Sequence, residues 1–133
     1  MLFRSKAVAL APNVFDARLN LFAGYATAGK VDEAEEQVTA MQNLGAFQVT
    51  QYLRVAGIYV TEKQYQPAIE LLREAIEFYP QEAQLYGMLA QSYILKGDRD
   101  AARAVLVDFS KIEPQIEGHI DEYLKQLEEQ VRG

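Results

Sequence analysis

Residues 49–82 read VTQYLRVAGIYVTEKQYQPAIELLREAIEFYPQE, and this stretch decides the fold. Its first half carries apolar residues at the i, i+3, i+4, i+7 spacing of one helical stripe: Tyr52, Val55, Ala56 and Tyr59. A polar break at Lys63 and Gln64 is followed by a second apolar stripe. Pro80 ends that stripe, because proline disfavours helical backbone in the residue before it. We therefore expect two helices joined by a short turn.

The same residues recur along the chain with a period of 34. The tyrosines and alanines each recur three times in one register: Tyr25, Tyr59 and Tyr93, then Ala34, Ala68 and Ala102. Pro80 and Pro114 share the period, and Gly29 and Gly97 lie two periods apart. Repeats of this length indicate supersecondary units that stack to bury a continuous core.

The period and the residue types resemble the tetratricopeptide repeat, whose pattern runs W-x2-L-G-x2-Y, then A-x3-F, then P. Residues 49–82 supply Tyr52, Val55, Ala56, Tyr59, Ala68, Leu72 and Pro80 at these positions. Residues 83–116 supply Tyr86, Leu89, Ala90, Tyr93, Ala102, Leu106 and Pro114. Residues 15–48 are degenerate: they keep Leu21, Tyr25 and Ala34 but have Arg18, Phe22 and Ala46 at the aromatic, small and proline positions.

The resemblance covers essentially the whole chain and implies an all-α fold. We expect a right-handed superhelical stack of antiparallel helix hairpins, a TPR-like α-solenoid with about eight helices. The expected divisions are one second helix of a truncated preceding repeat, three repeats and a capping helix: residues 1–14, 15–48, 49–82, 83–116 and 117–133. In this interpretation Leu2–Leu10 form the first helix and Pro12 closes it.

Composition and motifs offer little for catalysis. The chain has no cysteine and one histidine, His119, which excludes thiol chemistry and metal sites that need two imidazoles. No glycine-rich phosphate loop is present. We therefore expect a protein that is not an enzyme and has no cofactor or metal.

Charge and hydropathy bear on the partners. The net charge of −6, with scattered Lys and Arg, argues against a nucleic-acid partner. No stretch is apolar enough to insert directly into a membrane. The first twelve residues lack the features of a signal peptide. A chain without cysteine suits the cytoplasm and the periplasm alike, so the sequence leaves the compartment open.

The repeat register predicts a peptide-binding groove, since the first helix of each hairpin lines the concave side of such arrays. The groove residues are mostly small or apolar, with one basic side chain: Leu19, Ala23, Leu53, Arg54, Gly57, Val60, Gly87, Met88, Gln91 and Ile94. Two of them are glycines within helices. Gly57 and Gly87 are interpreted in one of three ways: as a bare strip that admits a ligand backbone, as sites of close helix packing, or as neutral drift in a scaffold with stability to spare.

The sequence supports several functions of one general kind. The first is a scaffold that binds a peptide or helix of a protein partner in an apolar concave groove, within a larger protein of bacterial character. The second is an assembly arm that self-associates through its N-terminal end, where Leu2, Val8 and Leu10 lack a hairpin partner. The third is the C-terminal TPR tail of a larger bacterial membrane-bound glycan ligase or polymerase, which rests on analogy of layout.

Overall fold

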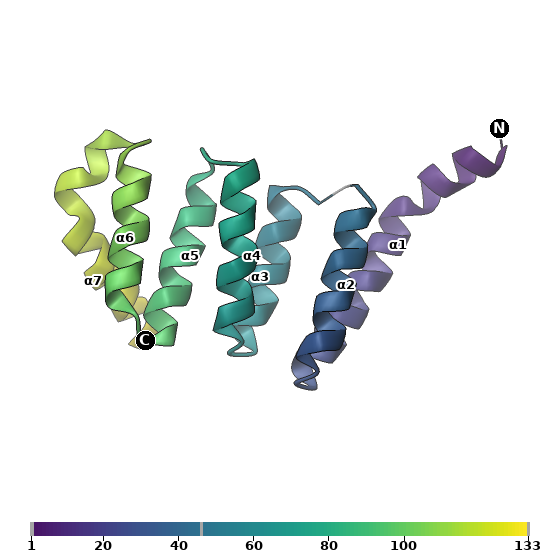
Figure 1. Ribbon diagram of the computed structural model, residues 1–133, viewed down its shortest axis with the longest axis horizontal. Helices are drawn as coiled ribbons and strands as arrows, with labels where there is room; N and C mark the ends of the chain where they lie inside the picture. The colour runs from purple at the N-terminus through teal and green to yellow at the C-terminus, as the bar shows by residue number, and fades with distance from the viewer. Residues whose placement is uncertain (1, 46, 133) are drawn as a thin grey trace. The chain divides into compact units, whose positions relative to one another are not determined.

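The computed structural model describes the backbone of residues 2–45 and 47–132 and the side chains of residues 14–45 and 47–132. The described backbone forms seven α-helices and one 3-10 helix (Figure 1). Their bounds are α1 Leu2–Thr27, α2 Val31–Asn43, α3 Val49–Thr61, α4 Tyr65–Phe78, α5 Ala83–Lys96, α6 Arg99–Ser110, η1 Pro114–His119 and α7 Ile120–Arg132. The prediction of an all-α fold built from consecutive antiparallel helices is confirmed.

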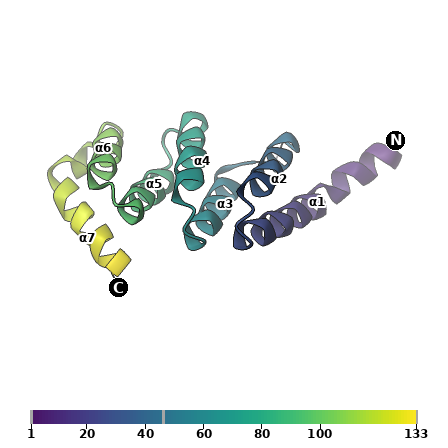
Figure 2. The same ribbon diagram turned by 60° about the horizontal axis from the view of Figure 1, so that its bottom comes forward.

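The chain divides into two compact units, residues 1–51 and residues 52–133. In the first unit, α1 packs against α2. In the second unit, α5 packs against both α4 and α6, and α7 packs against α5 and α6. Figure 2 shows the two layers of this second unit, with α4 and α6 in one layer and α3 and α5 in the other.

One turn geometry recurs in all three helix hairpins. The backbone N–H of Lys30 donates to the carbonyl of Tyr25 at 2.9 Å, and bonds of 2.8 Å join Gln64 to Tyr59 and Asp98 to Tyr93. Each bond spans a residue with positive φ: Gly29 at 77°, Lys63 at 62° and Gly97 at 94°. This 6→1 bond over a left-handed residue is the Schellman way of ending a helix. The 34-residue period therefore fixes the turns as well as the helices.

Lys63 is the strained member of this series, because a side chain at positive φ crowds the backbone where glycine does not. We expect Lys63→Gly to raise the free energy of unfolding by up to about 1 kcal/mol. Urea denaturation followed by circular dichroism measures the change. Gly97→Ala is the matched control and should destabilise. If Lys63→Gly destabilises the protein instead, the strain at this turn has been assigned wrongly.

Small, fully buried residues occupy the positions where we expect the two helices of a hairpin to cross. In the second unit Ala56 of α3 and Ala68 of α4 have no exposed surface, and neither do Ala90 of α5 and Ala102 of α6. Larger buried side chains flank these positions, among them Tyr52, Val55, Leu72 and Leu89. A methyl group at the crossing lets the two helix backbones approach closely, and so the flanking side chains interdigitate.

A larger residue at this crossing should force the hairpin apart. We expect Ala56→Leu to lower the free energy of unfolding by about 1–3 kcal/mol, because overpacking a core displaces neighbouring side chains. The same change at the exposed Ala104 of α6 serves as the control and should have little effect. Equal denaturation midpoints for the two variants would contradict the assignment of Ala56 to the crossing.

The first unit differs from the sequence prediction at Pro12. A break was expected there, between one helix over Leu2–Leu10 and the next repeat, but α1 runs without interruption through Leu2–Thr27. The chain around Pro12 is rich in alanine and leucine, which favour helix. A proline inside a helix removes one hydrogen bond and can be accommodated by a bend. The described helices therefore number seven rather than eight. The predicted self-association through Leu2, Val8 and Leu10 concerns side chains outside the described set.

The buried face of α1 is also offset from that of the later repeats. Leu21 is 49% exposed, whereas its equivalent one period later, Val55, is fully buried. Phe22 occupies the crossing position that Ala56 fills in α3, and its ring is fully buried. A ring of this size cannot fit the alanine geometry, so α1 presents a different face to α2. Arg18, at the aromatic position, lies on the surface and donates to the side-chain oxygen of Gln37 at 3.1 Å.

Candidate functional site

The structure places eight of the ten predicted groove residues in the second unit, on α3 and α5. On α3, Leu53, Gly57 and Val60 are half-buried and Arg54 is exposed. On α5, Gly87 is exposed, and Met88, Gln91 and Ile94 are half-buried. These two helices lie in the same layer of the unit (Figure 2). Six of these eight residues are apolar or glycine, and all eight have some solvent access, as the residues of a binding surface need.

The remaining two predicted residues belong to α1 in the first unit. Leu19 is only 6% exposed and forms part of the core with Phe15 and Phe22. Ala23 is half-buried. Leu19 is therefore a core residue, because the buried face of α1 is offset by the bulk of Phe22. The site described below is the part of the prediction that lies in the second unit.

The two helical glycines face open space. A Cβ atom added to Gly57 or Gly87 would have no described heavy atom within 4 Å, outside its own helix turn and chain neighbours. The interpretation of these glycines as sites of close helix packing is therefore wrong. A bare strip on α3 and α5 fits the geometry, since no described residue of the second unit fills the space above it.

This openness has a measurable consequence. Glycine within a helix costs about 0.5–1 kcal/mol relative to alanine, mainly through the entropy of the unfolded chain. We expect Gly57→Ala and Gly87→Ala each to stabilise the protein by about that amount, because the added methyl meets nothing. Denaturation midpoints measure the effect. Gly29→Ala is the control and should destabilise, because Gly29 has φ 77°. A loss of stability at Gly57 or Gly87 would mean that these positions are crowded.

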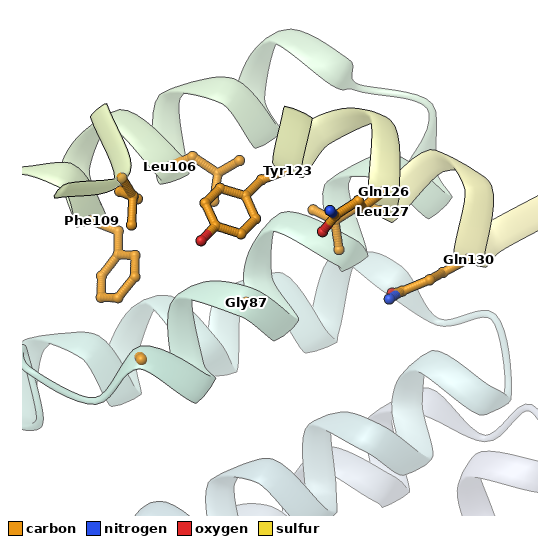
Figure 3. Close-up of a pocket in the computed structure, with 9 residues that line it drawn as sticks. Gly87, Leu106, Phe109, Tyr123, Gln126, Leu127 and Gln130 are labelled. Carbon is orange, nitrogen blue, oxygen red and sulfur yellow. The ribbon is translucent and has the colours of Figure 1, made fainter. Parts of the chain in front are cut away.

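A cleft of about 290 Å³ lies between α5, α6, η1 and α7 (Figure 3). Ala83 and Gly87 contribute the small residues of α5. The other lining residues are either apolar or polar without a charge: Leu106, Phe109, Ile116, Tyr123, Gln126, Leu127 and Gln130. Tyr123, at 41% exposed, offers much of its surface to solvent. None of the described residues that line the cleft is charged, so the cleft suits an apolar group.

The sequence did not predict this cleft, although it placed Gly87 in the site. Tyr123 and Leu127 lie within residues 117–133, for which the sequence predicted only a capping helix. In the structure, Ile120 and Leu124 make the buried contact of α7, while Tyr123 is exposed and Leu127 is half-buried. The sequence did hold a clue to the cleft: α7 carries more apolar residues than its buried contact, made by Ile120 and Leu124, requires.

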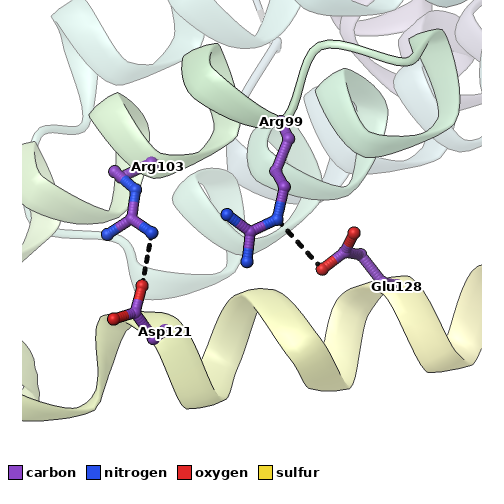
Figure 4. A network of polar contacts seen from close by, with 4 residues as sticks. All are labelled: Arg99, Arg103, Asp121 and Glu128. Carbon is purple, nitrogen blue, oxygen red and sulfur yellow. Dashed lines mark hydrogen bonds and ion pairs between the residues drawn. The ribbon is translucent and has the colours of Figure 1, made fainter.

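Ion pairs join α7 to α6 (Figure 4). Arg103 pairs with Asp121, and Arg99 Nε lies 3.2 Å from Glu128 Oε1. These side chains are between 30% and 77% exposed, and surface pairs of this kind contribute at most about 1 kcal/mol each. The buried Ile120 and Leu124 therefore supply most of the attachment of α7. The ion pairs orient the helix that forms one wall of the cleft.

Potential metal ligands do not gather in the described part of the chain. No group of three or more His, Cys, Asp or Glu side chains in that part could hold a metal ion. His119 is exposed, with its Nδ1 3.3 Å from Glu122 Oε2 on the same surface. No described helix combines the length and apolar character needed to cross a membrane.

Comparison with known families agrees with this architecture. Residues 59–129, more than half of the chain, match the tetratricopeptide repeat family. The chain therefore belongs to that family, whose repeats are typically non-catalytic and mediate protein–protein interaction. No curated protein and no solved structure matched the chain.

Proposed function

We propose that the second unit binds an uncharged, apolar segment of a partner protein along the face of α3 and α5, with the cleft beside α7 as its anchor pocket. The cleft itself carries the proposal. It combines small residues on α5 with apolar walls, and its described lining is uncharged. A cleft of this kind accepts one or two large apolar side chains and would reject a charged one, which it cannot solvate.

Two amides at the cleft favour an extended segment over a helical one. Gln126 and Gln130 both line the cleft and lie one helical turn apart on α7. Residues four apart on a helix are separated by about 6 Å along its axis. Alternate residues of an extended chain are separated by about 6.6 Å. Each glutamine amide can therefore bond to the backbone of one of two alternate ligand residues while the side chain between them enters the cleft.

Selection from a library of random peptides displayed on phage tests the proposal directly. The wild-type protein should select peptides with apolar anchors, and Gly87→Arg should select none of them, because the added side chain fills the cleft. Gly118→Arg adds the same charge at an exposed site in η1 outside the cleft and should leave selection unchanged. Circular dichroism must show that both variants fold.

Titration of the selected peptides then tests the physical basis of binding. Affinity should change little between low and high salt, because buried apolar contacts are not screened and exposed ion pairs are. Gly57→Arg should also weaken binding if the segment continues along α3. Peptides that bind Gly87→Arg as tightly as wild type would refute the anchor pocket. A steep loss of affinity as salt is added would instead indicate that ion pairing by the exposed Arg54 provides most of the binding.

A further inference from the structure

A second pocket, of about 300 Å³, lies on the other layer of the same unit. Helices α4 and α6 form its sides, and Tyr86 and Leu89 of α5 contribute to its lining. The apolar lining side chains are Ile76, Leu89, Ala104 and Val105. None of its described residues belongs to the predicted groove or to the cleft beside α7. The ligand of this pocket can therefore differ from the ligand of the groove.

The charged groups of this pocket have unequal freedom. Arg73 is held by Tyr93: its Nε donates to the tyrosine hydroxyl at 2.8 Å, a second guanidinium nitrogen contacts the same oxygen, and its charge lies 5.4 Å from the ring centre. Glu77 on α4 and Asp108 on α6 are both exposed and line the pocket from opposite helices. Lys111 approaches Asp108 at 3.6 Å, but both side chains are more than two-thirds exposed, so the pair is weak.

Tyr86 adds to the acceptor character of this site. Its hydroxyl donates to the carbonyl oxygen of Pro80 at 2.7 Å, so this hydroxyl can offer a ligand only its oxygen as an acceptor. Burial and the nearby charge of Asp108 raise the pKa of Tyr86 above its ordinary value. The carboxylate of Asp108 thus acts electrostatically on the pocket lining. An anionic ligand would meet two carboxylates and an arginine whose Nε is already bonded.

We propose that this pocket is a second binding site, which receives a lysine or arginine side chain from a partner protein. The aliphatic stem packs on Ile76, Leu89 and Val105, and the cationic head lies between the carboxylates of Glu77 and Asp108. Long basic side chains bury their methylene groups along apolar surface and keep the charge at its edge. Charge-assisted bonds to two carboxylates fix the head group. The net charge of −6 favours approach of such a partner.

The groove and this pocket are proposed to select opposite kinds of ligand. The groove is proposed to take an uncharged segment, and affinity there should be insensitive to salt. The pocket between α4 and α6 requires a cation, and affinity there should fall as salt rises, because Glu77 and Asp108 are exposed. The two sites can therefore be tested independently on the same full chain.

The test is an NMR titration of the isotopically labelled full chain with three capped tripeptides, Ac-Ala-X-Ala-amide, in which X is arginine, norleucine or glutamate. The arginine peptide should give saturable shifts at Tyr86, Leu89 and Ala104. The norleucine peptide has a stem of similar length without the charge and should bind at least about fivefold more weakly, a difference typical of one or two exposed charge pairs. The glutamate peptide should give no shifts there.

Isosteric variants identify the charges responsible. Glu77→Gln with Asp108→Asn should weaken binding of the arginine peptide about fivefold or more and remove its salt dependence. Glu129→Gln alters an exposed carboxylate of α7 outside both pockets and should leave the affinity within about twofold. Circular dichroism should show all variants folded, since these side chains lie on the surface. Equal binding of arginine and norleucine, unchanged binding by the double variant, or no shifts at millimolar peptide would each overturn the proposal.

Discussion

The close approach of two helices at an alanine is the constraint on which the second unit depends. Ala56 and Ala68, like Ala90 and Ala102, are at the positions where we expect the helices of each hairpin to cross; their methyl groups have no exposed surface, and buried tyrosines and leucines flank them in the sequence. This contact sets which face of α3 and α5 is buried. It thereby also limits which part of each helix surface stays uncovered, and Gly57 and Gly87 lie on that uncovered part, where an added Cβ would meet nothing within 4 Å.

The 34-residue period was enough to predict the hairpins of the second unit, because tyrosine, alanine and proline each hold a fixed position in them. The same period applies to the turn conformation, which the residue types did not reveal: Lys63 has a positive φ, as Gly29 and Gly97 do at the equivalent positions. The period did not predict the buried face of α1, because the repeat positions are kept there but the size of the residue at the alanine position is not. Phe22 occupies the alanine position, and its volume turns Leu19 inward and Leu21 outward. The cleft beside α7 was missed for another reason: an apolar stripe shows that residues share a face but not how much of it a neighbour covers.

The cleft beside α7 and the pocket between α4 and α6 meet at one aromatic contact. Tyr86 lines the pocket between α4 and α6, and Phe109 lines the cleft beside α7. Their rings stack with centroids 5.0 Å apart. Tyr86 is buried, and its hydroxyl is tied to Pro80, which leaves the pair little room to reorient. A rigid wall of this kind keeps an apolar cleft and an acidic pocket close together without mixing their chemistry.

The attachment of α7 has a consequence for the order of events in folding. From α4 to α7, each helix packs on its neighbour or next neighbour along the chain, so these contacts are local and form quickly. Helix α7 is attached by two buried side chains and exposed ion pairs, so its local opening costs less than that of α5. A ligand in the cleft would contact this weakly attached helix, and by linkage its binding free energy would be added to the cost of opening α7. Occupancy of the cleft and amide protection in α7 are therefore two measures of one equilibrium.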